Sequence, residues 1–427
     1  MTNPLVLFFA TVVSLWAAGH ALLSKRDSKS ALAWIGVCIL VPIVGPILYL
    51  LFGINRITTR ARKSFRSISI RRPDEYISEP VGTTFRPMSL VGEQVTGFGL
   101  ASCQSIRLLQ NGEQLYPAML EAIRAATNHI YLATYIFQHD ETGILFADEL
   151  ARARDRGVEV RIIIDDLGAK LYKPGIVRAL RKRHLAYRLF NPITLFPPAL
   201  HINMRNHRKI LTVDGSTAFT GGQNIGDRHL AEKPDNPHCA MDLHFQIEGK
   251  IVDDLERAFL KDWIQCGKAN EEVLFQPNNE NNAESLTWAR MVLDGPNENL
   301  DKLNAVLIGV FSAAKHRIWI MTPYFLPGPE ILSALYAARI RGVDVRILLP
   351  ERTNIHMAHW AAQHTLPYIL NRNLEVYLQP PPFIHTKAIL IDDNYALIGS
   401  ANLDPRSLRL NFELGVEVFS TAFNTEL

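Results

Sequence analysis

The strongest constraint on this chain of 427 residues is an internal repeat. The segment RGVEVRIIIDD at 156–166 returns as RGVDVRILLPE at 341–351. Each copy follows a helix-like stretch, which in turn follows an apolar strand, HIYLATYIF from His129 or RIWIMTPYF from Arg317. A repeated order of strand, helix and strand places parallel strands in a sheet with helices packed against it. We therefore predict an α/β fold of two repeated halves, with mixed, largely parallel sheets flanked by helices.

A second pattern also occurs twice, and every position in it is offset by 178 residues, from His207 to His385. The first copy comprises His207, Lys209, Asp214, Gly221, Gly222 and Asn224, and the second comprises His385, Lys387, Asp392, Gly399, Ser400 and Asn402. A lone histidine in a strand is usually structural. Six positions of matching type, repeated at identical spacing, favour a shared chemical role instead.

The spacing within each copy indicates how the side chains are arranged. HRKILTV and HTKAILI read as strands, and side chains two residues apart on a strand point to the same face. Each histidine should therefore face one site together with the lysine two residues later. The small residues that follow allow close backbone approach, and Asn224 and Asn402 add hydrogen-bond donors. This set suits a phosphate diester, because lysines and amides hold the oxygens while one imidazole attacks phosphorus and the other protonates the leaving oxygen.

Asp214 and Asp392 complete the motif and belong to the candidate catalytic set with the two histidines and the two lysines. Each follows a strand and precedes a turn, a position where aspartate commonly makes hydrogen bonds to nearby backbone. A structural role is therefore the favoured interpretation for these two residues. Asn224 and Asn402 are the candidate substrate-binding residues.

These residues resemble the paired His-x-Lys-x4-Asp motifs of the phospholipase D superfamily, and the chain as a whole is similar to bacterial cardiolipin synthases. RNHRKILTVDG and the later segments HTKAILIDD, IGSANLDPRS and LNFE carry the likeness. The resemblance implies two phospholipase D-like halves that transfer a phosphatidyl group between two phosphatidylglycerol molecules, releasing glycerol, through a phosphohistidine and without a metal or cofactor. It also implies that His207 is the nucleophile and His385 the acid. An acid beyond each motif, Asp242 or Glu413, would orient the histidine of that motif.

The N-terminal region predicts a membrane anchor. Residues 4–23 and 31–53 are uncharged, and about 20 helical residues span the hydrocarbon layer of a bilayer. Two such stretches close together indicate a transmembrane hairpin in the bacterial inner membrane. Pro42, Gly45 and Pro46 lie in the middle of the second stretch and make a kink or a re-entrant path an alternative. The basic residues that follow at 56–72 favour a cytoplasmic position for the catalytic halves and contact with anionic lipids.

These features divide the chain into four segments: a transmembrane hairpin at 1–55, a basic juxtamembrane segment and linker at 56–105, a first half at 106–275 and a second half at 285–427. Relatives usually continue for several dozen residues beyond the last motif. The second half ends soon after that motif, so we expect it to be truncated or to lack a closing helix.

Other functions fit the sequence less well. A nuclease would use similar diester chemistry, but a net charge of +3 and two apolar stretches do not favour nucleic acid as a partner. A hydrolytic phospholipase D or another phosphatidyltransferase is an open alternative, because the choice between water and an alcohol depends on contacts that the motifs do not encode. The four cysteines form no Cys-x-x-Cys pair, and we predict no metal site. No feature of the sequence indicates an oligomeric state.

Overall fold

The computed structural model describes residues 4–25, 28–53, 85–171, 173–192, 204–233, 236, 238–267, 275, 287–297 and 299–427. It separates into two compact units, residues 1–64 and residues 65–427. The basic cluster predicted at 56–72 lies outside the described residues and stays a prediction, as do the boundaries of the four predicted segments.

The described residues of the N-terminal unit form the helices α1 (Pro4–Ser24), α2 (Ser28–Leu40) and α3 (Val44–Leu48) and the π-helical turn η1 (Tyr49–Gly53). Its small buried cluster consists of Ala17, Ala18, Ala21, Cys38 and Tyr49. The second apolar stretch is not one continuous helix, because α2 ends just before Pro42, which lacks a backbone donor and disfavours helix in the residue before it. Within the described residues, no helix combines the length and the apolar character needed to cross a bilayer.

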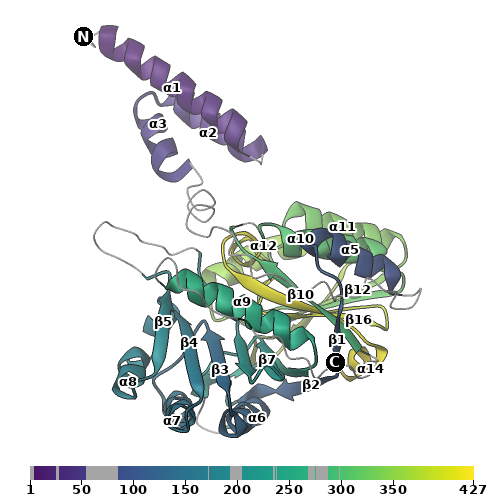
Figure 1. Cartoon of the computed structure of the whole chain (residues 1–427). Coiled ribbons are helices and arrows are strands. Elements are labelled where there is room, and N and C mark those ends of the chain that lie inside the picture. The colour runs from purple at the N-terminus through teal and green to yellow at the C-terminus, as the bar shows by residue number, and fades with distance from the viewer. Residues whose placement is uncertain are drawn as a thin grey trace. The chain divides into compact units, whose positions relative to one another are not determined.

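The first half of the larger unit is built on a seven-stranded sheet with the order β2-β9-β7-β6-β3-β4-β5 (Figure 1). Its strands are β2 (Ser105–Gln110), β3 (His129–Thr134), β4 (Glu159–Asp165), β5 (Ala186–Phe190), β6 (Ile210–Val213), β7 (Thr217–Gly221) and β9 (Leu243–Glu248). The helices on one face are α6 (Asn111–Ala125), α7 (Glu141–Asp155) and α8 (Ile176–Lys182), and α9 (Ile251–Cys266) covers the other. Because both faces are covered, the apolar run of β4 is buried along most of its length.

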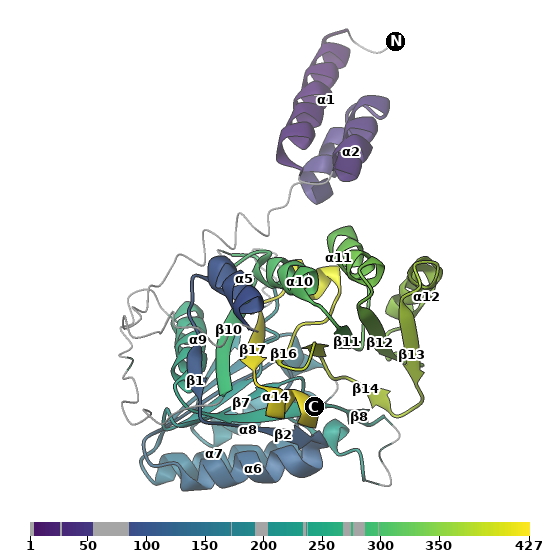
Figure 2. The ribbon, with the colours of Figure 1, turned by 90° about the vertical axis from the view of Figure 1, so that its right-hand side faces the viewer.

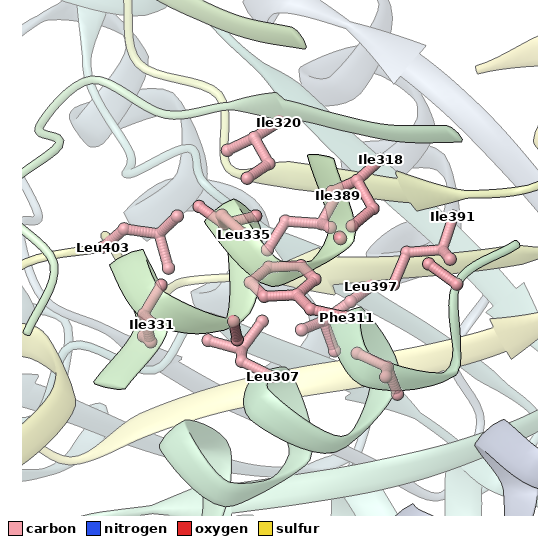
Figure 3. Packing of buried hydrophobic residues seen from close by; sticks show 14 of the residues in the cluster. Leu307, Phe311, Ile318, Ile320, Ile331, Leu335, Ile389, Ile391, Leu397 and Leu403 are labelled. Atoms are coloured by element: carbon pink, nitrogen blue, oxygen red, sulfur yellow. The ribbon is translucent and has the colours of Figure 1, made fainter. Parts of the chain in front are cut away.

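The second half is built on an eight-stranded sheet with the order β1-β10-β17-β16-β15-β11-β12-β13 (Figure 2). Its strands are β1 (Ala101–Cys103), β10 (Thr287–Asp294), β11 (Arg317–Met321), β12 (Asp344–Pro350), β13 (Glu375–Gln379), β15 (Ala388–Ile391), β16 (Tyr395–Gly399) and β17 (Glu413–Phe419). Its helices are α5 (Arg86–Thr96), α10 (Lys302–Ala313), α11 (Pro329–Ile340), α12 (His356–Leu370), α13 (Pro405–Arg409) and α14 (Thr421–Glu426). Figure 3 shows the apolar core, in which Phe311 of α10 and Leu335 of α11 pack with Ile389 of the sheet.

Both sheets are mixed, as predicted, but antiparallel pairs outnumber parallel ones. The parallel pairs lie in β3-β4-β5 and β11-β12-β13, which contain the repeated segments of strand, helix and strand. The motif strands form antiparallel hairpins, β6 with β7 and β15 with β16, joined by short turns that begin at Asp214 and Asp392. A short turn can join antiparallel strands but not parallel ones, so the expectation of largely parallel sheets does not hold for the motif strands.

The two halves meet beside the motifs. Strand β8 (Ala240–Met241) pairs in parallel with β14 (Phe383–Ile384), and an isolated bridge pairs Asn206 with Phe412. The residues just before each motif histidine therefore lie beside the residues just before the candidate acid of the other half.

Candidate active site

Main-chain hydrogen bonds hold each motif histidine against the opposite half. The His385 N–H donates to the Met241 carbonyl at 2.7 Å, and the His207 N–H donates to the Phe412 carbonyl at 2.9 Å. Both acceptor residues directly precede a candidate acid in the sequence. The backbone therefore brings each histidine to the acid of the other half.

The side chains pair crosswise as a result. His207 Nδ1 lies 3.0 Å from Glu413 Oε2, and His385 Nδ1 lies 2.7 Å from Asp242 Oδ2. An ionised carboxylate only accepts hydrogen bonds, so each Nδ1 carries a hydrogen, and in the neutral ring each Nε2 keeps its lone pair. The expectation that each acid orients the histidine of its own motif is therefore corrected. The acids exchange partners because long-range backbone contacts, and not the order of the motifs, decide which segments are neighbours.

Small residues at matched positions make room for these carboxylates. A Cβ atom on Gly222 would stand 2.4 Å from Asp242 Oδ1, which is too close for any side chain. The matched residue is Ser400, whose Oγ donates to Glu413 Oε2 at 2.5 Å. The sequence had suggested close backbone approach at these positions, and the structure shows that the group approached is the acid that supports a histidine.

Both motif lysines are buried beside the histidines. Lys209 Nζ donates to the His207 carbonyl at 2.6 Å, and Lys387 Nζ donates to the His385 carbonyl. Burial is the main reason that the pKa of Lys209 falls to about 7 and the pKa of Lys387 to about 8. A phosphate anion beside these amines favours their charged form and raises both pKa values. An anionic substrate therefore stabilises the two cations that would hold it.

Burial also keeps both imidazoles neutral in the absence of substrate. It is the largest cause lowering the pKa of His207, and the negative charge of Glu413 opposes it. The pKa of His385 lies well below its usual value, first because of burial and then because of the charges of Lys387 and Lys209. A neutral Nε2 is the form required of a nucleophile, and an entering phosphate anion raises the pKa of either ring.

Both histidines line one cavity of about 770 Å³. Its lining from the two halves includes Tyr135, Asn224, Arg228, His229, Tyr324, Asn402 and Arg406. The Tyr135 ring packs edge-on against the His207 ring with centroids 5.0 Å apart. Asn224 Oδ1 accepts the Ile136 N–H at 3.1 Å, which leaves the amide N–H groups of Asn224 as donors. The cavity thus combines two imidazoles with amide donors and cations, as transfer at a phosphate diester requires.

Comparison with known proteins assigns this arrangement to a family. Residues 119–263 and 307–427 match the family described as cardiolipin synthase, PLD-like domain, and residues 12–53 match the phospholipase D-nuclease N-terminal family. The chain belongs to the cardiolipin synthase family. The resemblance seen in the motifs is confirmed, and so is the predicted class of enzyme, a phosphatidyltransferase of the phospholipase D superfamily.

Similar proteins cover nearly the whole chain. It is 33% identical to cardiolipin synthase 1 of Bacillus anthracis, over 96% of this chain and 83% of that protein. It is 30% identical to the major cardiolipin synthase ClsA of Bacillus subtilis, over 94% of this chain and 86% of that protein. The crystal structure of phosphatidylserine synthase from Haemophilus influenzae has a TM-score of 0.60 at 18% identity and covers 79% of this chain and 89% of that one. This last likeness concerns the fold alone.

The two motif aspartates of this cardiolipin synthase homologue do not reach the cavity. The Asp214 carboxylate accepts the N–H groups of residues 127–129 at 2.8 to 2.9 Å, and the Asp392 carboxylate accepts those of residues 315–317 at 2.7 to 3.2 Å. Both have a left-handed backbone with φ of 51°, and neither lines the cavity. They tie each motif hairpin to the start of β3 or β11, and these contacts fit the structural role that the sequence favoured.

Several cavity residues were missed in the sequence. His229 lines the cavity, burial lowers its pKa to about 3, and its Nε2 accepts the Asn224 N–H at 3.2 Å. The matching position of the second half is Ser407, so the repeat gave no signal for this histidine. Arg228 and Arg406 do share the 178-residue offset, and extending the motif by four residues would have found them. Within the described residues, no three His, Cys, Asp or Glu side chains group as metal ligands.

Proposed function

We propose that this protein makes cardiolipin and glycerol from two molecules of phosphatidylglycerol through a phosphohistidine on His207. The observation that carries the proposal is the crosswise arrangement of two imidazoles around one cavity, each with its Nδ1 beside a buried carboxylate. Two such rings on one cavity suit a double displacement at a single phosphorus. The curated relatives named as cardiolipin synthases support this choice of reaction.

In the first step, His207 Nε2 attacks the phosphorus of the donor lipid. A P–N bond forms, the P–O bond to glycerol breaks, and the leaving oxygen takes a proton from His385. Glu413 stabilises the positive charge that develops on His207. Lys209 and Lys387 neutralise the phosphate oxygens, and the bound anion raises the pKa of His385 toward its protonated form.

In the second step, the terminal hydroxyl of another phosphatidylglycerol enters where glycerol left. His385 is now neutral and removes the hydroxyl proton as the oxygen attacks phosphorus. The P–N bond to His207 breaks, cardiolipin is released, and His385 is protonated again. Water in place of the lipid alcohol would give phosphatidic acid, so synthase and hydrolase differ in the acceptor alone.

The test of this function is product analysis. The purified full-length chain in detergent is incubated with phosphatidylglycerol labelled in its acyl chains and in its headgroup glycerol. We expect equal amounts of cardiolipin and free glycerol, and added glycerol should reverse the reaction because the bonds exchanged are alike. Phosphatidic acid as the main product would replace the proposal with a hydrolytic phospholipase D.

The roles of the two imidazoles are tested by trapping the intermediate. His207→Ala and His385→Ala should each abolish turnover of phosphatidylglycerol. His385→Ala should still react slowly with a donor that carries a good leaving group, because such a group departs without a proton. Mass spectrometry should then find the phosphatidyl adduct on the peptide that contains His207. An adduct on the His385 peptide of the wild type would reverse the two roles, and no adduct in any variant would count against covalent catalysis.

We also propose that the N-terminal unit anchors the enzyme in the bacterial inner membrane, with the catalytic halves on the cytoplasmic side. Helix α1 has no Asp, Glu, Lys or Arg, and its exposed large apolar side chains include Phe8, Phe9, Leu15, Trp16 and Leu22. Such a surface suits the apolar region of a bilayer, and the basic residues at 56–72 suit anionic headgroups. High salt should leave the chain in the membrane fraction. Release by salt alone would show that charge, and not apolar burial, holds it there.

A further inference from the structure

An arginine stands four residues beyond the motif asparagine in each half. Arg228 follows Asn224, and Arg406 follows Asn402, so the two arginines share the offset of the motif. Both line the cavity that contains the two histidines. A guanidinium group stays protonated at any working pH, and its planar fork of donors fits phosphate oxygens.

Arg228 lies on the His385 side of the cavity. Its guanidinium carbon is 5.9 Å from the centroid of the Phe383 ring, and that ring is 6.1 Å from the His385 ring. The positive charge of Arg228 is also among the causes that lower the pKa of His385 and of Lys387. Arg406 is exposed and belongs to helix α13, whose N-cap residue, Asp404, interacts electrostatically with His207 instead.

The proposed reaction needs a second anion site. Each phosphatidylglycerol carries one phosphate, and the two lysines hold the one under attack. In cardiolipin a single glycerol joins the two phosphates, so the phosphate of the acceptor lies one glycerol away from the reacting phosphorus. The acceptor hydroxyl enters on the side of His385, which removes its proton. The second phosphate must therefore bind within the length of a glycerol from His385, and Arg228 is on that side.

We propose that Arg228 binds the phosphate diester of the acceptor lipid and so favours a phosphatidyl alcohol over a free alcohol or water as acceptor. This inference rests on the proposed function, because it takes His385 as the group that deprotonates the acceptor. Arg406 stands at the matched position on the opposite side and is not part of this subsite.

The test compares two acceptors in the same full-length enzyme. Cardiolipin formation uses an acceptor with a phosphate, whereas exchange of labelled free glycerol into phosphatidylglycerol uses one without. Arg228→Gln should lower the ratio of cardiolipin formation to glycerol exchange about tenfold or more, the usual effect of losing a charge-assisted hydrogen bond. Arg228→Lys keeps the charge and should recover part of the ratio. Arg409→Gln is the matched control, because Arg409 lies on α13, pairs with Glu330 at 3.2 Å and does not line the cavity.

Three results would overturn the inference. An equal fall in both reactions would place Arg228 on the donor phosphate or in the folding of the site. A selective fall in Arg406→Gln with none in Arg228→Gln would place the acceptor on the other side. A wild-type enzyme that exchanges glycerol but makes no cardiolipin would refute the proposed function itself, and the acceptor subsite with it. Glycerol exchange in each variant also reports whether that variant is folded.

A second feature is the uncharged and exposed helix α12. Its sequence, HMAHWAAQHTLPYIL, contains no Asp, Glu, Lys or Arg. Among residues 360–370, whose exposure is described, Ile369 alone is buried, while Trp360 is 67% exposed and Tyr368 is 47% exposed. The surface helix of a globular protein normally presents charged residues to water and buries its apolar side chains. Among residues 360–370, helix α12 has no charged residue and leaves Trp360, Tyr368 and Leu370 exposed.

We infer that α12 rests on the surface of the lipid bilayer that supplies the substrates. Asn354 and Ile355 directly precede the helix and line the catalytic cavity, so the helix begins at the wall of the active site. Figure 2 shows α12 beside β13, the edge strand of the second sheet. Tryptophan and tyrosine favour the membrane–water interface. Arg372, whose guanidinium carbon lies 3.3 Å from the centroid of the Tyr368 ring, adds a cation suited to anionic headgroups.

The test uses the full-length enzyme reconstituted in phosphatidylcholine vesicles. It receives either long-chain phosphatidylglycerol in the bilayer or short-chain monomeric phosphatidylglycerol in solution. Trp360→Ser should slow the reaction of the bilayer substrate several-fold and leave that of the monomeric substrate unchanged. Leu145→Ser removes an exposed apolar side chain from α7 and should change neither. Equal slowing of both substrates, or of neither, would contradict the inference. A wild-type dimer that Trp360→Ser dissociates would make α12 a contact between copies of the chain instead.

Discussion

The crosswise pairs predict that each acidic substitution acts on the histidine of the opposite half. Glu413→Gln should impair His207, and Asp242→Asn should impair His385. Each pair is one hydrogen bond from Nδ1 to a fully buried carboxylate, 3.0 Å long for Glu413 and 2.7 Å long for Asp242. A hydrogen bond to a charged group contributes about 1.5 to 3 kcal/mol, and about 1.4 kcal/mol is tenfold in rate, so each substitution should slow its own step about 10- to 150-fold.

Single-turnover kinetics separate the two steps. In a phosphatidyl ester of p-nitrophenol the leaving group departs without an acid, so the burst of p-nitrophenol reports attack by His207 alone. Glu413→Gln should slow this burst by the full factor. Asp242→Asn should leave the burst nearly unchanged and slow turnover of phosphatidylglycerol, whose glycerol leaves with a proton. Glu159→Gln is the control, because it removes a partly exposed carboxylate from β4, away from the cavity.

The opposite pattern would refute the pairing. If Asp242→Asn slows the burst while the adduct still forms on His207, then Asp242 supports His207 and the histidine–acid pairs are not crosswise. If the wild-type adduct forms on His385, the pairing stands but the roles of the two imidazoles are exchanged. An equal loss of both steps would indicate a damaged fold, which the unfolding temperature of the variant would reveal.

Three further predictions concern pH, stability and membrane attachment. Lys209 and Lys387 lose their charge as pH rises through about 7 to 8, so kcat/KM should fall in this window. The free energy of unfolding should rise over the same window, because the unfolded chain, in which the lysine pKa is 10.5, binds more protons than the folded chain. A flat pH profile of kcat/KM would contradict this. Asp214→Ala should lower the free energy of unfolding by about 1 to 3 kcal/mol, measured by thermal unfolding, while kcat of the folded enzyme stays near wild type. Alkaline extraction should leave the full-length chain in the membrane fraction, as a blot of both fractions would show.

The repeat predicted which histidines and lysines form the site, but it did not predict which acid pairs with which histidine. The alternation in HRKILTV and HTKAILI placed each lysine beside its histidine, and both Nζ atoms donate to the histidine carbonyls. The partner of each acid could not be predicted in this way, because two similar halves can pair within themselves or with each other. Contacts between distant segments decide the matter, since β8 lies beside β14 and Asn206 lies beside Phe412.

Some features that differ from the expectation could still have been predicted from short segments of the sequence. The short turns at Asp214 and Asp392 exclude parallel pairing of the motif strands, so the antiparallel majority follows from turn length. The end of α2 just before Pro42 follows from the missing backbone donor of proline. The position of Arg228 next to Phe383 is different, because it depends on the pairing of the two halves and on no local pattern.

Because each acid supports the histidine of the other half, the two imidazoles have similar surroundings. Small differences between these surroundings must therefore decide which imidazole is the nucleophile and which is the acid. On one side, His207 has the full negative charge of Glu413 at 3.0 Å, which opposes the effect of burial and supports the cation formed on attack. On the other side, His385 also has a carboxylate, that of Asp242 at 2.7 Å, but its ring lies 6.2 Å from the His229 ring, and Arg228 adds to the positive charges that disfavour its protonation. His385 therefore holds a proton when a phosphate anion compensates those charges, and it releases that proton readily to the leaving oxygen. A histidine that becomes protonated when its substrate binds suits the role of acid, because it takes up a proton from water as the anionic lipid enters.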